Sequence, residues 1–181
     1  MAKTLIIVII PFEIDIKNNE YDNDVWQHSI ETIRILQSES KENEMVHMKP
    51  IIFKDQQTFK NETQHLSHEY VIINTYIVAH GTLVTMGNDG DKQLSAESIG
   101  SMINYILAIH TQLNNIYLFS CQSAMGMLPK VWDHIIQKKS CSLFGINGFI
   151  GHVKGKKHIY VSESYGGPAR WRYQQRLVIA K

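Results

Sequence analysis

The sequence predicts one α/β domain in which a mostly parallel sheet is covered by helices on both faces. Apolar runs of strand length alternate along the chain with segments whose apolar residues recur at helical spacing. The chain has 181 residues, of which 44% are hydrophobic, and its formal charge is +1. This length suffices to bury one hydrophobic core and is short for two. We therefore expect residues 1–181 to form a single domain.

The first half of the chain begins with a strand and a helix. Residues 5–10 are the first expected strand, and Asp24 is a candidate N-cap for a helix that reaches residue 37. Residues 48–53 predict a second strand and the polar span 54–69 a loop. Residues 71–79 predict a third strand, which could begin with a hairpin partner near residue 71.

The second half continues the alternation after a turn at residues 87–91. Ser95 and Ser98 open a helix with an apolar stripe formed by Ile99, Met102, Ile103, Ile106 and Leu107. Residues 116–120 follow as a fourth strand and residues 142–146 as a fifth. Between them, residues 127–138 predict a helix whose buried face carries Leu128, Val131, Trp132, Ile135 and Ile136. Strands that alternate with helices in this way indicate a parallel sheet.

The last part of the chain, residues 151–181, is distinguished by its charge. It holds seven basic residues and one acidic residue, whereas residues 1–150 carry a net charge of −5. Glycines and Pro168 divide it into short segments, which predicts a β-hairpin flap packed on the end of the sheet. The sign asymmetry points to an anionic partner. The candidate anion-binding residues are Lys154, Lys156, Lys157, Arg170, Arg172 and Arg176.

Other classes of protein and site are disfavoured by composition. The apolar opening is too short for a membrane span and has no small-residue cleavage site, so we expect neither a membrane partner nor a signal peptide. Two cysteines give no disulfide framework, which leaves Cys121 as a free thiol. The pair His65 and His68 lacks further ligands at metal-binding spacing. We therefore expect no metal and no required cofactor.

Two apolar runs end on reactive side chains. Residues 76–79 lead into His80 and Gly81, and residues 116–120 lead into Cys121. Because the carboxyl ends of parallel strands meet at one edge of a sheet, the imidazole and the thiol are expected to lie together. His80 would take the thiol proton and later protonate a leaving amine, while the N–H groups of Gly81 and Cys121 would stabilise an oxyanion.

A structural explanation exists for each residue alone. A cysteine on an apolar strand is usually a small buried hydrophobe, and a histidine after a strand is usually a hydrogen-bonded structural group. Both residues here stand at the strand ends where open α/β sheets place their ligands. That coincidence favours a catalytic pair, and Cys141, which lacks this context, is expected to be a core or surface thiol.

The order of these motifs resembles that of the caspase-like cysteine peptidases. An apolar block that ends in His-Gly precedes a second block that ends in a small residue and Cys. The intervening 94–99 segment and the 115–121 segment are most similar to the inositol-hexakisphosphate-activated cysteine protease domain of MARTX and large clostridial toxins. The resemblance covers roughly residues 70 to 150 by motif order.

The resemblance implies a caspase-like three-layer sandwich, a protein or peptide substrate, and a catalytic dyad of His80 and Cys121 without an obligatory third member. It also implies activation by inositol hexakisphosphate bound by the basic residues of the flap region. Such a trigger would suit a bacterial protein delivered into a host cytosol, and a soluble protein of the bacterial cytoplasm is the other expectation. This chain carries no cargo on either side, so cleavage in trans stands beside autoprocessing.

Two alternatives remain open. An α/β amidotransferase-like hydrolase would take its histidine from downstream of the cysteine, which promotes His134, His152 or His158 and leaves His80 unused. A caspase-like module with an unused site would bind an anion or a protein without catalysis. A solvated tail or a nucleic-acid patch is a further explanation of the basic segment, but its interleaved aromatic residues favour a folded anion site over nucleic acid.

Overall fold

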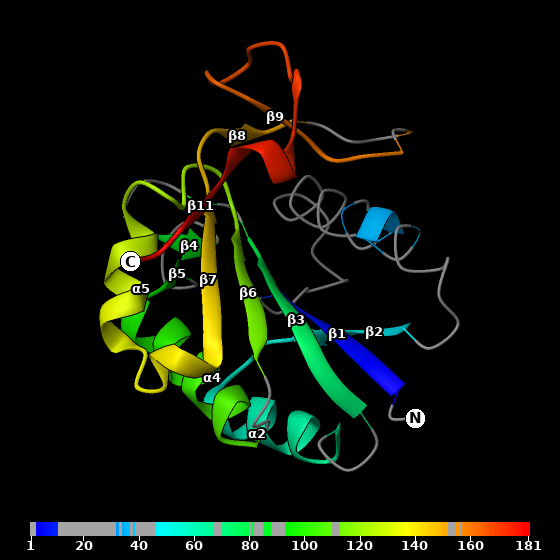
Figure 1. Ribbon diagram of the computed structural model, residues 1–181, viewed down its shortest axis with the longest axis vertical. Helices are drawn as coiled ribbons and strands as arrows, with labels where there is room; N and C mark the ends of the chain where they lie inside the picture. Colours follow the sequence, from blue (N-terminus) through cyan, green and yellow to red (C-terminus); the bar gives the residue numbers. More distant parts are fainter. Residues whose placement is uncertain are drawn as a thin grey trace.

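A six-stranded, mostly parallel sheet forms the centre of the molecule in the computed structural model (Figure 1). The structure describes residues 3–10, 32, 34–36, 38, 46–66, 70–79, 81, 85–87, 93–109, 113–151, 155 and 157–181. The strand order is β11-β7-β6-β3-β1-β2, and only β11 pairs with its neighbour in an antiparallel sense. The strands are β1 (Lys3–Ile10), β2 (Val46–Ile52), β3 (Tyr70–Val78), β6 (Asn114–Phe119), β7 (Cys141–Ile146) and β11 (Leu177–Ile179).

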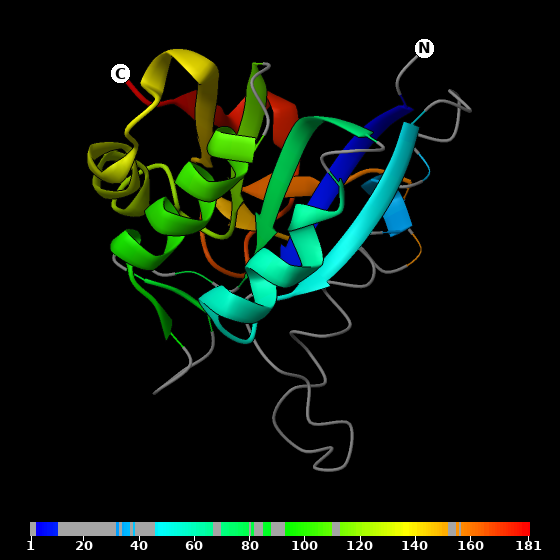
Figure 2. The same ribbon diagram turned by 90° about the horizontal axis from the view of Figure 1, so that it is seen from below.

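Three helices cover one face of the sheet (Figure 2). They are α2 (Gln56–Gln64), α4 (Ala96–Ile109) and α5 (Met127–His134). The apolar stripe predicted for α4 is buried throughout and packs against strand residues such as Ile77, Ile116 and Leu118. Alternate residues of the same strands point to the opposite face, because side chains alternate along a strand.

The opposite face carries a second core cluster. Tyr76, Tyr117 and Phe144 form a row across β3, β6 and β7, with ring centroids 4.5 and 5.2 Å apart in stacked pairs. Buried Ile35 and Leu36, which belong to a helical segment, pack in this cluster. The described residues therefore place helical structure on both faces of the sheet.

A small antiparallel sheet lies beyond the carboxyl ends of the parallel strands (Figure 1). Its order is β10-β9-β8, formed by β8 (Phe149–Ile150), β9 (Tyr160–Ser162) and β10 (Trp171–Arg172). The short helix η3 (Tyr173–Arg176) then leads into β11, which returns to the central sheet beside β7. The C-terminal region is thus both a small sheet at the strand ends and an edge strand of the main sheet, and the second role was not predicted.

The predicted strands are confirmed within a few residues of their ends, but three expectations differ. Residues 56–64, within the span 54–69 that was expected to be a loop, form α2. Residues 70–78 form one uninterrupted strand, so β3 does not break near residue 71. The helix predicted at residues 127–138 ends at His134, and Ile136, expected on its buried face, is 82% exposed. The turn between β4 (Met86–Gly87) and β5 (Gln93–Leu94), and the start of the helix expected from Asp24, lie outside the described residues.

The side chain of Asn104 explains the early end of α5. Its amide nitrogen donates to the carbonyl of His134 at 2.9 Å, and its amide oxygen accepts from the N–H of Ile136 at 2.9 Å. These two hydrogen bonds take the place of the backbone hydrogen bonds that His134 and Ile136 would make if the helix continued for another turn. The chain therefore leaves the helix at Ile135, and the side chain of Ile136 turns outward.

Helix α2 is organised by its N-cap. The carboxylate of Asp55 accepts from the N–H of Thr58 at 2.7 Å and from its hydroxyl at 3.0 Å. Phe59 and Thr63, four residues apart on one face, are buried. The segment is mostly polar, and for this reason the sequence did not predict a helix here. Two buried positions and one cap are enough to stabilise a short helix that packs against neighbouring elements.

Substitution of Asp55 tests this cap. We expect Asp55→Ala to lower the melting temperature by roughly 2–4 °C, because the N–H of Thr58 loses its acceptor. Asp55→Asn should retain most of the stability near neutral pH. Hydrogen bonds from Thr58 lower the pKa of Asp55, so its stabilising effect is present above the ordinary value of 3.8 and is lost as pH falls through the folded-state pKa.

Thermal melts of the three proteins between pH 2 and 7 check this prediction. The acid-dependent part of the stability that Asp55 contributes should be missing in Asp55→Asn. A melting temperature for Asp55→Ala equal to that of the unsubstituted chain at pH 7 would contradict the assignment of Asp55 as the cap.

Candidate functional site

Cys121 lies in the turn that follows β6, at the carboxyl edge of the parallel strands. Strands β3 and β6 are neighbours, and Val78 pairs with Phe119 at the ends of their ladder. The N–H of Ala79 continues this contact to the carbonyl of Phe119 at 3.4 Å. The turn that carries the thiol and the end of β3 are therefore adjacent.

Gly81 contacts the same turn closely. A Cβ placed on Gly81 would collide with the hydroxyl oxygen of Ser120 and would lie 2.8 Å from the carbonyl oxygen of Cys121. Only a residue without a side chain fits this distance from a backbone carbonyl. His80 lies outside the described residues, but its two neighbours in the chain, Ala79 and Gly81, both contact the segment that leads into Cys121.

The turn is hydrogen-bonded to the connection between β7 and β8. The N–H of Ala124 donates to the carbonyl of Ile146 at 3.2 Å, and that of Gln122 donates to the carbonyl of Gly148 at 2.8 Å. Residues 121–124 therefore pair with residues 146–150 in the opposite chain direction. We call this pairing the Cys121 ladder.

Side chains complete the Cys121 ladder at both ends. At one end the N–H of Ile150 lies 3.3 Å from the Cys121 sulfur, which replaces a carbonyl as the acceptor. At the other end the buried Ser123 hydroxyl donates to the carbonyl of Leu118 at 2.6 Å and accepts from the N–H of Ile146 at 2.8 Å. The thiol is thus held from β8, and its turn is held from β6 and β7.

Two backbone positions allow the turn to approach β7 this closely. A Cβ on Gly145 would lie 2.7 Å from both the nitrogen and the Cα of Ala124. Gln122, the residue after the cysteine, has a φ of 55°, in the left-handed region that few residues other than glycine adopt. Strain of this kind persists where surrounding contacts determine the conformation, as the Cys121 ladder does here.

The electrostatics of the thiol favour its neutral form. Burial raises the pKa of Cys121 above its ordinary value of 9.0, and the N–H groups of Ile150 and of Cys121 itself act in the opposite direction. Cys141 is a core thiol, and burial raises its pKa to about 11. Activation of Cys121 at neutral pH therefore requires a nearby base or positive charge.

The two predicted oxyanion donors come from adjacent segments. Among the described residues no carbonyl accepts the N–H of Cys121, and this N–H acts on the sulfur of its own residue. Gly81 forms a single antiparallel bridge with Met86 and lies against the turn of Cys121. The hydroxyl of Ser120 between them is buried and has no hydrogen-bond partner in the described part of the chain.

The six predicted basic residues fall into three sets. Lys154 and Lys156 lie outside the described residues. Lys157, Arg170 and Arg172 are exposed and belong to the segments around β9 and β10. An anion site is therefore compatible with these three side chains, which no acidic partner in the described residues neutralises.

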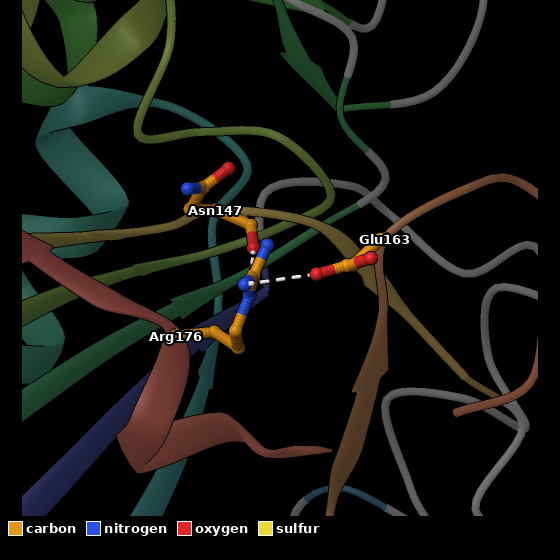
Figure 3. Close-up of polar contacts among 3 residues, drawn as sticks. All are labelled: Asn147, Glu163 and Arg176. Carbon is orange, nitrogen blue, oxygen red and sulfur yellow. Dashed lines mark hydrogen bonds and ion pairs between the residues drawn. The ribbon is translucent and has the colours of Figure 1, made fainter. Parts of the chain in front are cut away.

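Arg176 is committed to contacts within the protein (Figure 3). Its Nε donates to the carbonyl of Asn147 at 2.7 Å, and its guanidinium lies 3.6 Å from the carboxylate of Glu163. The N–H of Asn147 donates in return to the carbonyl of Arg176 at 2.9 Å. Arg176 therefore fastens η3 to the β7–β8 connection, which is one side of the Cys121 ladder.

Of the three downstream histidines, one ends α5, one lies two residues before the start of β9, and one lies outside the described residues. His134 ends α5 and packs against Gly100 of α4, roughly 10 Å along the helix axis from its start. His158 packs edge-on against Tyr160 in the small sheet, and His152 is not described. Within the described ranges, no group of three or more His, Cys, Asp or Glu side chains could hold a metal ion. The helices in those ranges are also too short or too polar to cross a membrane.

Sequence reasoning missed two residues of the site. Ser123 follows Cys121 by two positions, and five of the seven residues from Ser120 to Gly126 are small, which was a signal for a closely packed turn. Ile150 contributes only its backbone N–H from 29 positions away, so no local pattern marks it. Ile150 reaches the sulfur only because the tertiary structure places β8 beside the Cys121 turn.

No protein-family model matches this chain, and neither does any curated protein sequence.

Alkylation by iodoacetamide tests the state of the Cys121 thiol. We expect the rate to rise with pH and to reach half its maximum above the ordinary pKa of 9.0, because burial disfavours the thiolate. The measurement uses Cys141→Ala, so that only Cys121 is followed. A rate that stays high and constant below pH 7 would instead show a thiolate already paired with an imidazolium.

Gly81→Ala tests the contact between the end of β3 and the turn. The added methyl group would meet the carbonyl of Cys121, and we expect a loss of roughly 1–3 kcal/mol in the free energy of unfolding. The alkylation rate of Cys121 should also change. Gly100→Ala, which crowds the Cβ of His134 at 2.5 Å between α4 and α5, is the matched control. Gly100→Ala should lower stability without altering the alkylation rate of Cys121. An equal change in the alkylation rate of the two variants would contradict the contact between Gly81 and the Cys121 turn.

Proposed function

We propose that this protein is a cysteine peptidase in which His80 activates the thiol of Cys121. The main support is the approach of Gly81 to Ser120 and Cys121 across neighbouring parallel strands. His80 is the residue between Ala79 and Gly81, both of which contact this segment. An imidazole there would supply the base that the raised pKa of Cys121 requires.

The proposed reaction proceeds in two stages. The thiol proton passes to the imidazole of His80 as the sulfur attacks the scissile carbonyl, and the N–H groups of Cys121 and Gly81 stabilise the oxyanion. The proton then passes to the leaving amine as the C–N bond breaks. Water, deprotonated by His80, attacks the thioester and releases the acid and the free thiol.

The proposed architecture is that of a caspase-like peptidase. Its support is the mostly parallel sheet, helical structure on both faces, and the small antiparallel sheet at the carboxyl ends of the strands. The order of His-Gly before Ser-Cys along neighbouring strands agrees with it. The substrate class that follows is a protein or peptide.

Activation by inositol hexakisphosphate or a similar polyanion is part of the proposal. Exposed Lys157, Arg170 and Arg172 lie in or beside the small sheet, and guanidinium groups suit clustered phosphates. The sheet is coupled to the thiol, because β8 donates the N–H of Ile150 to the Cys121 sulfur. Arg176 serves a different purpose here, since its contacts are with Asn147 and Glu163.

One observation favours a second candidate, an anion-binding module without catalysis. A buried thiol with a raised pKa is unreactive unless a base activates it, and an unused site would keep such a thiol. For the amidotransferase-like hydrolase, His134 is a poor base because it packs against α4 at the far end of α5, which leaves His152 and His158 as its candidates.

Covalent labelling and peptide cleavage test the peptidase. We expect a thiol-directed acyl probe to label the unsubstituted chain, and peptides to be cleaved, more strongly with inositol hexakisphosphate than without it. Cys121→Ala should abolish both, and His80→Ala should lower cleavage by roughly 100-fold or more. Arg170→Ala combined with Arg172→Ala should weaken activation by the polyanion.

Cys141→Ala is the matched control, since it removes the other thiol and should retain labelling and cleavage. Full activity in His80→Ala would place the base elsewhere and sink the dyad. Polyanion binding with neither labelling nor cleavage would favour the non-catalytic module.

A further inference from the structure

We propose that Ser123 is a positioning residue for Cys121, and that its buried hydroxyl fixes the turn so that the thiol meets the N–H of Ile150. The catalytic part of this inference rests on the proposed peptidase function. Its structural part concerns the reactivity of Cys121 and stands independently of any substrate.

The hydroxyl of Ser123 uses both of its hydrogen-bonding capacities. It donates to the carbonyl of Leu118 at 2.6 Å and accepts from the N–H of Ile146 at 2.8 Å, and the residue is fully buried. Leu118 belongs to β6 and Ile146 is the last residue of β7. One oxygen therefore joins the two strands on either side of the cysteine turn.

The Ser123 hydroxyl lies at the point where the regular pairing of β6 with β7 ends. The pairing of β6 with β7 stops at Leu118 and Gly145, so the backbone groups beyond it need other partners. The Ser123 hydroxyl supplies a partner to each strand. An alanine would leave the buried N–H of Ile146 without its acceptor.

The same bridge sets the distance between the two sides of the Cys121 ladder. The N–H groups of Ala124 and Gln122 bind the carbonyls of Ile146 and Gly148, and the next contact along is the one between Ile150 and the sulfur. A displacement at Ile146 therefore moves β8 relative to the thiol. Loss of the hydroxyl should weaken the Ile150 contact, although Ser123 does not touch the sulfur.

The geometry also accounts for why a serine suits this position. The turn approaches β7 so closely that a Cβ on Gly145 would lie 3.1 Å from the carbonyl carbon of Ser123. A short side chain reaches both strands without widening this gap. The positive φ of Gln122 next to it is then held by contacts on both sides.

The test compares Ser123→Ala with Thr63→Val, a matched control. Thr63 has a buried hydroxyl that donates to the carbonyl of Phe59 at 2.7 Å within α2, away from the turn. Both variants lose one buried hydroxyl, so both should melt at a lower temperature. Only Ser123→Ala should shift the alkylation profile of Cys121 to higher pH, because the thiolate loses an N–H donor.

Peptide cleavage supplies the second readout. We expect kcat to fall roughly 10- to 100-fold in Ser123→Ala, with KM changed by less than about threefold, since a displaced nucleophile slows chemistry more than binding. Thr63→Val should retain the kcat of the unsubstituted chain. Equal alkylation profiles for the two variants would overturn the positioning role. If neither cleaves and the unsubstituted chain does not either, the peptidase proposal fails while the alkylation result still decides the role of Ser123.

Amide hydrogen exchange of the unsubstituted chain covers the case in which Ser123→Ala does not fold. The N–H of Ile146 should be protected like the amides within β6 and β7, and that of Ile150 should be protected while the thiol is free and unalkylated. Exchange of Ile146 at the rate of an exposed amide would overturn the bridge.

Discussion

The structure around the candidate site depends on the pairing of residues 121–124 with residues 146–150. This ladder joins the turn after β6 to the connection after β7, and its last acceptor is the sulfur of Cys121. The backbone groups of both paired segments are buried beside the strand ends, so each needs a hydrogen-bond partner. Some of these groups pair across the ladder, and others bind the hydroxyl of Ser123. The position of the thiol is therefore a consequence of backbone hydrogen bonding.

The small C-terminal sheet enters this arrangement from outside. Arg176 binds the carbonyl of Asn147, and the carboxylate of Glu163 lies near its guanidinium, so Arg176 joins η3 to the β7–β8 connection and to the residue after β9. Arg176 is thus in contact with two other segments of the protein, whereas the side chains of Arg170 and Arg172 are exposed. A count of charges along the sequence treats these arginines alike, and the difference in their contacts is visible only in the tertiary structure.

The strands, their parallel sense and the main helical stripe were predictable from the sequence, because period and length are local properties. The stripe of α4 is buried at every predicted position, and the cysteine stands at a strand end as expected. The predictions were wrong where a few long-range or capping hydrogen bonds determine whether an element forms or where it ends. Asp55 and two buried residues suffice for α2, Asn104 ends α5 early, and β11 finds its place only through pairing with β7.

The sequence by itself determined that an alternating α/β chain carries Cys121 at the end of an apolar strand, preceded by a second apolar strand that leads into His80 and Gly81. Tertiary structure alone decided that β3 and β6 are neighbours, that Gly81 touches the cysteine turn, and that Ile150 and Ser123 hold it. The reason is physical. Periodicity reports which face of an element is apolar, whereas contacts between backbone groups far apart in sequence depend on strand order and register, which no local pattern encodes.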